Sequence, residues 1–146
     1  LPVIAEIRGA CLGAGLEIAL SCHFRFASVN AMLGFPEVEH GLLPGLGGTL
    51  LSQAGVGRGA AIELLLSGRM IRGDEAAELK LVDAAVKTAE LCERTEAFAR
   101  GLTANRTRSQ IRNVMTAVHN SVRLDRESAL AEETRLFLEL AAGFAR

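Results

Sequence analysis

The sequence predicts an α/β fold, in which helices cover a sheet built mainly from parallel strands. Residues 2–7 are apolar and rich in β-branched side chains, which is typical of a buried strand. A loop of small residues at 11–15 follows, and residues 16–22 continue as an apolar helix. Two further strands are expected at 24–28 and 31–34. Because a strand, a glycine-rich loop, a helix and a strand succeed one another, we expect a parallel sheet with covering helices.

The middle of the chain is predicted to alternate between helices and one further strand. The chain turns helical after Pro36, and Gly68 stands where a left-handed C-terminal cap favours glycine. Asp74 is expected to cap the N-terminus of a short helix. The elements predicted in this part are helices at 46–54, 58–66 and 75–79, and a strand at 81–86.

From residue 88 onward, apolar residues spaced by three and four predict three amphipathic helices. The third apolar stripe is expected to lie at a subunit contact, because the chain has only a modest core to cover it. The stripes are Leu91, Phe98 and Leu102 in the first helix, Ile111, Val114, Met115, Val118 and Val122 in the second, and Leu130, Thr134, Phe137, Leu138 and Ala141 in the third.

The composition is that of a globular protein with no nucleic-acid or membrane partner. Of 146 residues, 49% are hydrophobic and 23% charged, and the net charge of −1 leaves no basic patch. No apolar run reaches the roughly 18 residues of a membrane span. The three cysteines lack metal or disulfide spacing, so we expect buried free thiols and a cytoplasmic location. Since the chain starts at Leu1 with a core strand, we expect a fragment or a processed product.

Glu17 is the first candidate for chemistry, because it lies between Leu16 and Ile18 in an otherwise apolar helix. A surface carboxylate near a helix N-terminus is the plainer interpretation. However, apolar neighbours on both sides leave little of this helix to face water. An apolar environment disfavours the charged form of a carboxylate, which makes such a residue a candidate acid or base.

Glu37 is the second candidate, since the preceding Pro36 fixes the turn and directs the next side chain. The alternative is an ordinary acidic residue at a helix N-terminus. Glu39 is equally acidic but lies in a stretch expected to form a solvated turn, and it is given no role.

Two glycine-containing loops and three histidines complete the inventory of possible sites. Residues 13–15 could present backbone N–H groups to an anion, although the third glycine of a dinucleotide fingerprint is missing. Residues 45–49 lack the Gly-Lys-Ser/Thr of a phosphate loop. His23, His40 and His119 have no spacing that suits a metal, so no metal site is predicted.

Taken together, these stretches strongly resemble the signature of the crotonase superfamily. The first motif leads through Gly13-Ala14-Gly15-Leu16-Glu17, and the second contains Phe35-Pro36-Glu37. Two long motifs at the right separation are more specific than a single short pattern. The resembling stretches are 2–5, 9–22, 33–49, 65–69 and 76–83, and the resemblance continues into the C-terminal helices.

The resemblance implies a ββα spiral core, whose C-terminal part is residues 1–87, followed by a helical trimerisation region at 88–146. Such enzymes act on acyl-CoA thioesters without a further cofactor and form homotrimers or hexamers. The thioester carbonyl lies between two backbone N–H groups, of which one matches Ala14. The other belongs to a loop upstream of Leu1 in the family pattern.

The resemblance also assigns roles to individual side chains of an enoyl-CoA hydratase. Glu17 and Glu37 match the two catalytic carboxylates, with Glu17 mainly activating water and Glu37 mainly delivering a proton. Gly45 matches a backbone position beside that water. The residues that match the lining of the acyl channel are Ala10, Leu12, Gly13 and Pro36.

Departures from the family pattern leave alternatives open. His23 replaces a common Asp and resembles the hydratase region of multifunctional β-oxidation enzymes, and Leu50-Leu51 replaces a commoner Gln-Arg pair. The superfamily also contains Δ3,Δ2-enoyl-CoA isomerases, many of which keep only the second glutamate. Retention of both glutamates favours hydration over isomerisation. A non-catalytic scaffold or subunit fragment is the third possibility.

Overall fold

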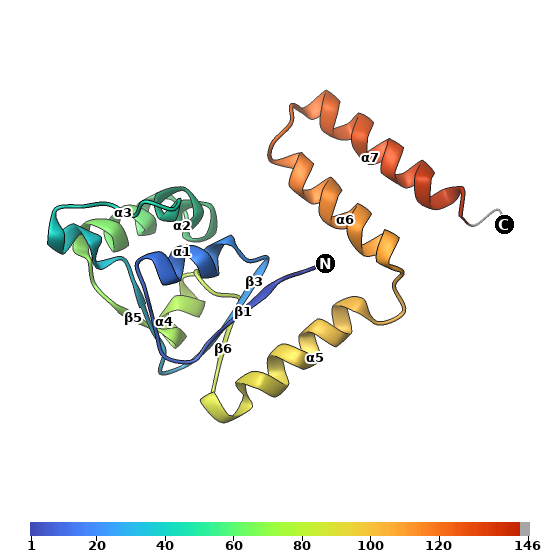
Figure 1. Ribbon diagram of the computed structural model, residues 1–146. Coiled ribbons are helices and arrows are strands. Elements are labelled where there is room, and N and C mark those ends of the chain that lie inside the picture. The colour runs from blue at the N-terminus through green and yellow to red at the C-terminus, as the bar shows by residue number, and fades with distance from the viewer. Residues whose placement is uncertain (144–146) are drawn as a thin grey trace. The chain divides into compact units, whose positions relative to one another are not determined.

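The computed structural model describes residues 1–143, and it confirms the predicted α/β class (Figure 1). Its elements in chain order are β1 (Ile4–Ile7), β2 (Ala10–Leu12), α1 (Ala14–Ser21), β3 (Phe24–Ser28), β4 (Met32–Gly34), the 3-10 helix η1 (Pro36–His40), α2 (Gly48–Val56), α3 (Arg58–Ser67), β5 (Ile71–Arg72), α4 (Gly73–Glu78), β6 (Ala84–Val86), the 3-10 helix η2 (Thr88–Glu90), α5 (Leu91–Thr103), α6 (Arg108–Ser121) and α7 (Arg126–Ala141).

The strands form two small sheets in which parallel pairing dominates. One sheet has the order β1-β3-β6 and is parallel throughout, with Ile4 opposite Phe24 and Phe26 opposite Ala84. In the other sheet, β2 pairs in parallel with β4, while the two-residue β5 runs antiparallel to β4. The first four strands along the chain therefore alternate between the two sheets, as in a spiral of ββα units, whereas β5 stays in the sheet of β4.

Two element boundaries differ from the sequence prediction for reasons visible in the hydrogen bonds. The predicted N-cap at Asp74 is wrong: α4 begins at Gly73, and the Asp74 carboxylate pairs with Arg72 instead. The strand predicted at 81–86 shortens to β6, because the amides of Leu81 and Val82 both donate to the Ala76 carbonyl in a turn after α4. The short strands β2 and β5 were not predicted as separate elements.

The hydrophobic core lies in the unit that spans Pro2–Ala99. It is built from α1, the strands that flank it, α3 and the turn after α4. Leu16, Leu33, Phe35 and Leu81 are almost completely buried. Helix α5 contacts the sheet through aromatic side chains, as Phe98 packs edge-on against Phe24 with ring centroids 4.9 Å apart.

A second compact unit comprises Leu1 and the chain from Arg100 onward. Helices α6 and α7 form a hairpin (Figure 1), in which the buried Asn113 amide donates to the Leu136 carbonyl. Leu136, which is outside the predicted stripe, is buried, whereas Phe137 and Leu138 of the stripe are exposed in the single chain. The predicted domain division into 1–87 and 88–146 stays a prediction.

The cysteines are free, as expected, but they are not uniformly buried. Cys92 lies exposed on α5, whereas Cys11 on β2 is half-buried, and burial raises the pKa of its thiol. Within residues 1–143, no helix combines the length and the apolar composition needed to cross a bilayer.

Candidate active site

Glu17 lies in the first turns of α1 and is only 2% exposed. Its Oε1 atom accepts two backbone hydrogen bonds, from the amides of Leu46 and Gly48, both at 2.7 Å. Gly48 is the first residue of α2, so the carboxylate is bound at a helix N-terminus, where free N–H groups favour negative charge. The two amide donors replace hydrogen bonds with water that the buried carboxylate has lost.

The contact between Glu17 and α2 requires glycine at position 48. A Cβ atom there would lie 2.7 Å from Pro44 Cβ, 2.8 Å from Phe35 Cε1 and 3.1 Å from Glu17 Cγ. The missing side chain therefore lets the start of α2 approach the Glu17 carboxylate closely.

The neighbouring Ile18 is 63% exposed, so the expectation that little of α1 faces water is wrong.

Glu37 follows Pro36 in η1, and its carboxylate lies against Gly13, the N-cap residue of α1. Its Oε1 atom is 2.8 Å from the place that a Cβ on Gly13 would occupy. Its Oε2 atom is buried and, among the described residues, has no hydrogen-bond partner. A buried carboxylate oxygen without a donor is costly in a folded chain, and it is typical of a site completed by a substrate, a water or a partner group.

Gly13 connects the two carboxylates through the first turn of α1. Its φ of +51° is a conformation that favours glycine, and its amide donates to the Gly34 carbonyl at 3.0 Å. The Gly13 carbonyl accepts the Glu17 amide at 3.0 Å, while its Cα faces Glu37. Ala14 begins the helix and is exposed, and within residues 1–143 its amide donates to no backbone carbonyl.

The remaining predicted site residues differ in their burial and in their contacts near the start of α1. Leu12 on β2 is half-buried and pairs with Gly34, whereas Ala10 at the start of the same strand is exposed. Pro36 is half-buried directly before Glu37, and Gly45 is exposed just before the amides that bind Glu17. The structure gives no contact that joins Ala10 or Gly45 to a carboxylate, so their roles stay predictions.

Sequence reasoning missed the backbone amides of Leu46 and Gly48 as partners of Glu17. The loop at 45–49 lacks the phosphate-loop pattern, so its sequence does not indicate an anion site. The loop nevertheless binds an anion through the amides of Leu46 and Gly48, although the anion is a side chain of the same molecule. Glycines that open a helix were the available signal, but the sequence does not show which acid they bind.

The other polar residues singled out from the sequence lie outside this arrangement. His23 Nδ1 accepts the Val3 amide at 3.1 Å, which is a structural contact, and His40 and Glu39 are exposed. Within the described residues, no group of three His, Cys, Asp or Glu side chains is placed to hold a metal ion.

Comparison with known proteins decides the family. The family model described as enoyl-CoA hydratase/isomerase matches residues 1–143. The chain belongs to this family. The resemblance to the crotonase superfamily is thereby confirmed, and with it the class of fold.

Among its relatives, the chain is 38% identical to the short-chain-enoyl-CoA hydratase of Clostridium acetobutylicum over 94% of its own length and 52% of that enzyme. It is also 38% identical to a glyoxysomal fatty acid beta-oxidation multifunctional protein of Cucumis sativus, over 93% of this chain and 18% of that protein. The chain thus spans about half or less of these relatives.

Solved structures agree with this assignment. A protein of Thermobifida fusca YX, assigned as an enoyl-CoA hydratase and crystallised with acetoacetyl-CoA, matches with a TM-score of 0.89 and 35% identity, over 96% of this chain and 55% of that one. An enoyl-CoA hydratase of Bacillus anthracis matches with a TM-score of 0.87 and 35% identity, over 93% and 52% of the two chains.

Proposed function

We propose that this chain carries the two catalytic carboxylates of an enoyl-CoA hydratase, which adds water to a 2-enoyl-CoA thioester. The observation that carries the proposal is that two glutamates meet at the start of α1, Glu17 within its first turn and Glu37 against its N-cap residue Gly13. Glu17 is held by two amides, and Glu37 has a buried oxygen that finds no hydrogen-bond partner within residues 1–143. The hydratases among the relatives support the choice of reaction.

The reaction that we propose divides the elements of water between C2 and C3 of the substrate. Glu17 accepts a proton from the water whose oxygen bonds to C3, and Glu37, which carries a proton at the start, delivers it to C2 on the same face of the double bond. Exchange through water then moves the proton from Glu17 back to Glu37, so that the next turnover starts from the same state. The negative charge that develops on the thioester oxygen is stabilised by the Ala14 N–H and a second donor outside this chain. The product is a 3-hydroxyacyl thioester, and no cofactor is required.

Glu17 suits the role of base because its position is fixed before substrate binds. The two amides that bind Oε1 leave the carboxylate little freedom to rotate, so no reorganisation is needed at the moment of reaction. Glu37 suits proton delivery, since its unpaired Oε2 is free to bind a water or a proton of the substrate.

Isomerisation of a 3-enoyl to a 2-enoyl thioester is the second candidate function. It needs one carboxylate that moves a proton between two carbons, and the unpaired oxygen of Glu37 provides such a group. The family description includes isomerases as well as hydratases. Glu17 would then have only a positioning role.

The proposed function is tested with the complete gene product on short-chain, medium-chain and aromatic 2-enoyl-CoA thioesters. We expect the enoyl absorbance to fall as water adds, with at least one substrate class turned over efficiently. Conversion of 3-enoyl-CoA without any hydration would favour the isomerase. Absence of both reactions would favour a non-catalytic scaffold and contradict the proposal.

A further inference from the structure

The segment at 68–70, between α3 and β5, contacts the chain on both sides of Glu37. A Cβ on Gly68 would lie 2.9 Å from Val38 Cγ1 and 3.0 Å from Glu39 Oε1, directly after Glu37. On the other side, a Cβ on Gly34 would lie 2.8 Å from the Arg69 carbonyl oxygen. The backbone of this segment therefore supports the η1 turn before and after the carboxylate.

The same support reaches the first turn of α1 through Gly34. The Gly34 carbonyl accepts the Gly13 amide at 3.0 Å, and Gly13 is the residue against which Glu37 Oε1 lies. A displacement of the segment at 68–70 would shift Gly34 and Val38 together. Both shifts would change where the Glu37 carboxylate stands relative to α1.

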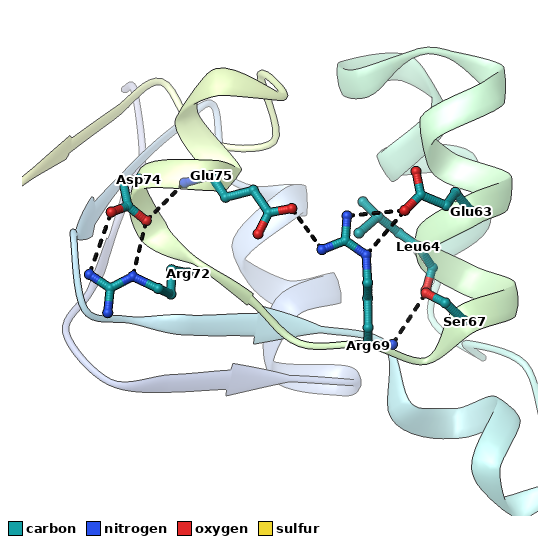
Figure 2. A network of polar contacts seen from close by, with 7 residues as sticks. All are labelled: Glu63, Leu64, Ser67, Arg69, Arg72, Asp74 and Glu75. Atoms are coloured by element: carbon teal, nitrogen blue, oxygen red, sulfur yellow. Dashed lines mark hydrogen bonds and ion pairs between the residues drawn. The ribbon is translucent and has the colours of Figure 1, made fainter.

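The side chain of Arg69 links this segment to two helices (Figure 2). Its Nη1 atom donates to Glu75 of α4 at 2.7 Å, and its Nε atom donates to Glu63 of α3 at 3.1 Å. The Arg69 amide also donates to Ser67 Oγ at 3.3 Å. The planar guanidinium thus donates from two separate nitrogens to carboxylates on different helices, a geometry that the single nitrogen of a lysine does not reproduce.

Because the side chains of Arg69 and Glu75 are partly exposed, we expect that loss of their ion pair changes the free energy of unfolding little. The position of the Glu37 carboxylate should change more. The side chains of Arg69 and Glu75 are 38% and 39% exposed, and ion pairs at such exposure contribute little to folding. Catalysis is more sensitive, because a misplacement of about 1 Å can cost on the order of 100-fold in rate.

We propose that Arg69 is a positioning residue for Glu37, acting through the backbone at 68–70 and through Gly34. This inference rests on the proposed function. Arg69 does not touch the reacting atoms, so it should influence the turnover number and leave substrate binding almost unchanged.

The test combines Arg69→Ala with Glu37→Gln in a double-mutant cycle, measured as steady-state hydration by the complete gene product. Arg69→Ala should lower kcat roughly 10-fold and change KM less than about twofold. In the Glu37→Gln background, Arg69→Ala should cause almost no further loss, because its effect passes through the carboxylate that is already gone. Arg69→Lys, which keeps a cation for one carboxylate, should recover part of kcat.

Arg72→Ala is the matched control, since Arg72 also forms an exposed ion pair, with Asp74, but does not support η1 (Figure 2). Its kcat should stay at the wild-type value. Equal losses for Arg69→Ala and Arg72→Ala, or a full 10-fold loss in the Glu37→Gln background, would overturn the inference.

If Arg69→Ala fails to fold, Glu75→Gln repeats the cycle with a smaller change. Absence of hydration by the wild type would instead overturn the proposed function, and this inference with it.

Discussion

The carboxylate of Glu17 is bound as an external anion would be bound at a helix N-terminus. Gly47, with φ of +100°, turns the chain into α2, and the amides of Leu46 and Gly48 converge on one oxygen. The helix dipole and the two donors offset part of the cost of burying an acid. A single glycine, at position 48, makes this approach possible.

Substitution of that glycine tests the packing at this point. Gly48→Ala should lower the free energy of unfolding by roughly 1–3 kcal/mol, because the added methyl group has no room beside Pro44, Phe35 and Glu17. Gly59→Ala is the control, since it lies in α3 with open space around it, and it should gain about 0.5–1 kcal/mol. Urea unfolding of both variants measures the difference, and equal stabilities would contradict the packing described here.

At this scale, the sequence offered a buried Glu17 as one of two interpretations, and the structure agrees with that one, but the partners of Glu17 were not predicted. The apolar neighbours of Glu17 were a local signal, whereas the amides that bind it lie 29 and 31 residues further along the chain. Glu37 was expected to follow a turn fixed by Pro36, and it does. Its contact with Gly13 depends on the pairing of β2 with β4, which residue types alone do not reveal.

At the scale of elements, local signals placed the helices well and the shortest strands poorly. The three C-terminal helices follow from apolar spacing, and α6 also begins with a complete capping box between Thr107 and Gln110. The strands β2 and β5 are two or three residues long, too short for alternation to show. They form because neighbouring strands supply hydrogen-bond partners.

The capping box predicts a local effect at the start of α6. Thr107→Ala removes the hydroxyl that accepts the Gln110 amide, at a cost of about 1 kcal/mol. Hydrogen exchange at the Gln110 amide should therefore accelerate roughly fivefold. Thr107→Ser keeps the hydroxyl and should retain the protection. Unchanged exchange in Thr107→Ala would show that the cap does not stabilise this turn.

At the scale of the whole molecule, α7 presents an apolar face that the single chain does not cover. Leu130, Phe137 and Leu138 are 54%, 68% and 59% exposed. Contiguous exposed apolar side chains of this kind mark interaction surfaces. This exposure supports the proposal of a homotrimer, or a hexamer of paired trimers, with α7 at the subunit contact.

Assembly is tested by sedimentation of the complete gene product at micromolar concentration. The wild type should sediment as a trimer or hexamer, and Phe137→Glu should dissociate it, because a charge would be buried at the contact. Glu127→Gln alters an exposed polar residue of the same helix and should leave the assembly intact. A monomeric wild type would contradict the proposed contact.

The central claim is that Glu17 and Glu37 divide the work of adding water, and one comparison of rates tests it most directly. Glu17→Gln keeps the size of the side chain and removes the base, so hydration of a 2-enoyl-CoA should fall by about 10²–10⁴-fold, or roughly 3–5 kcal/mol of barrier. Isomerisation of a 3-enoyl-CoA, where present, should survive through Glu37, whereas Glu37→Gln should lower both reactions by about 10²–10⁴-fold. Hydration by Glu17→Gln within a few-fold of the wild-type rate would contradict the two-carboxylate mechanism.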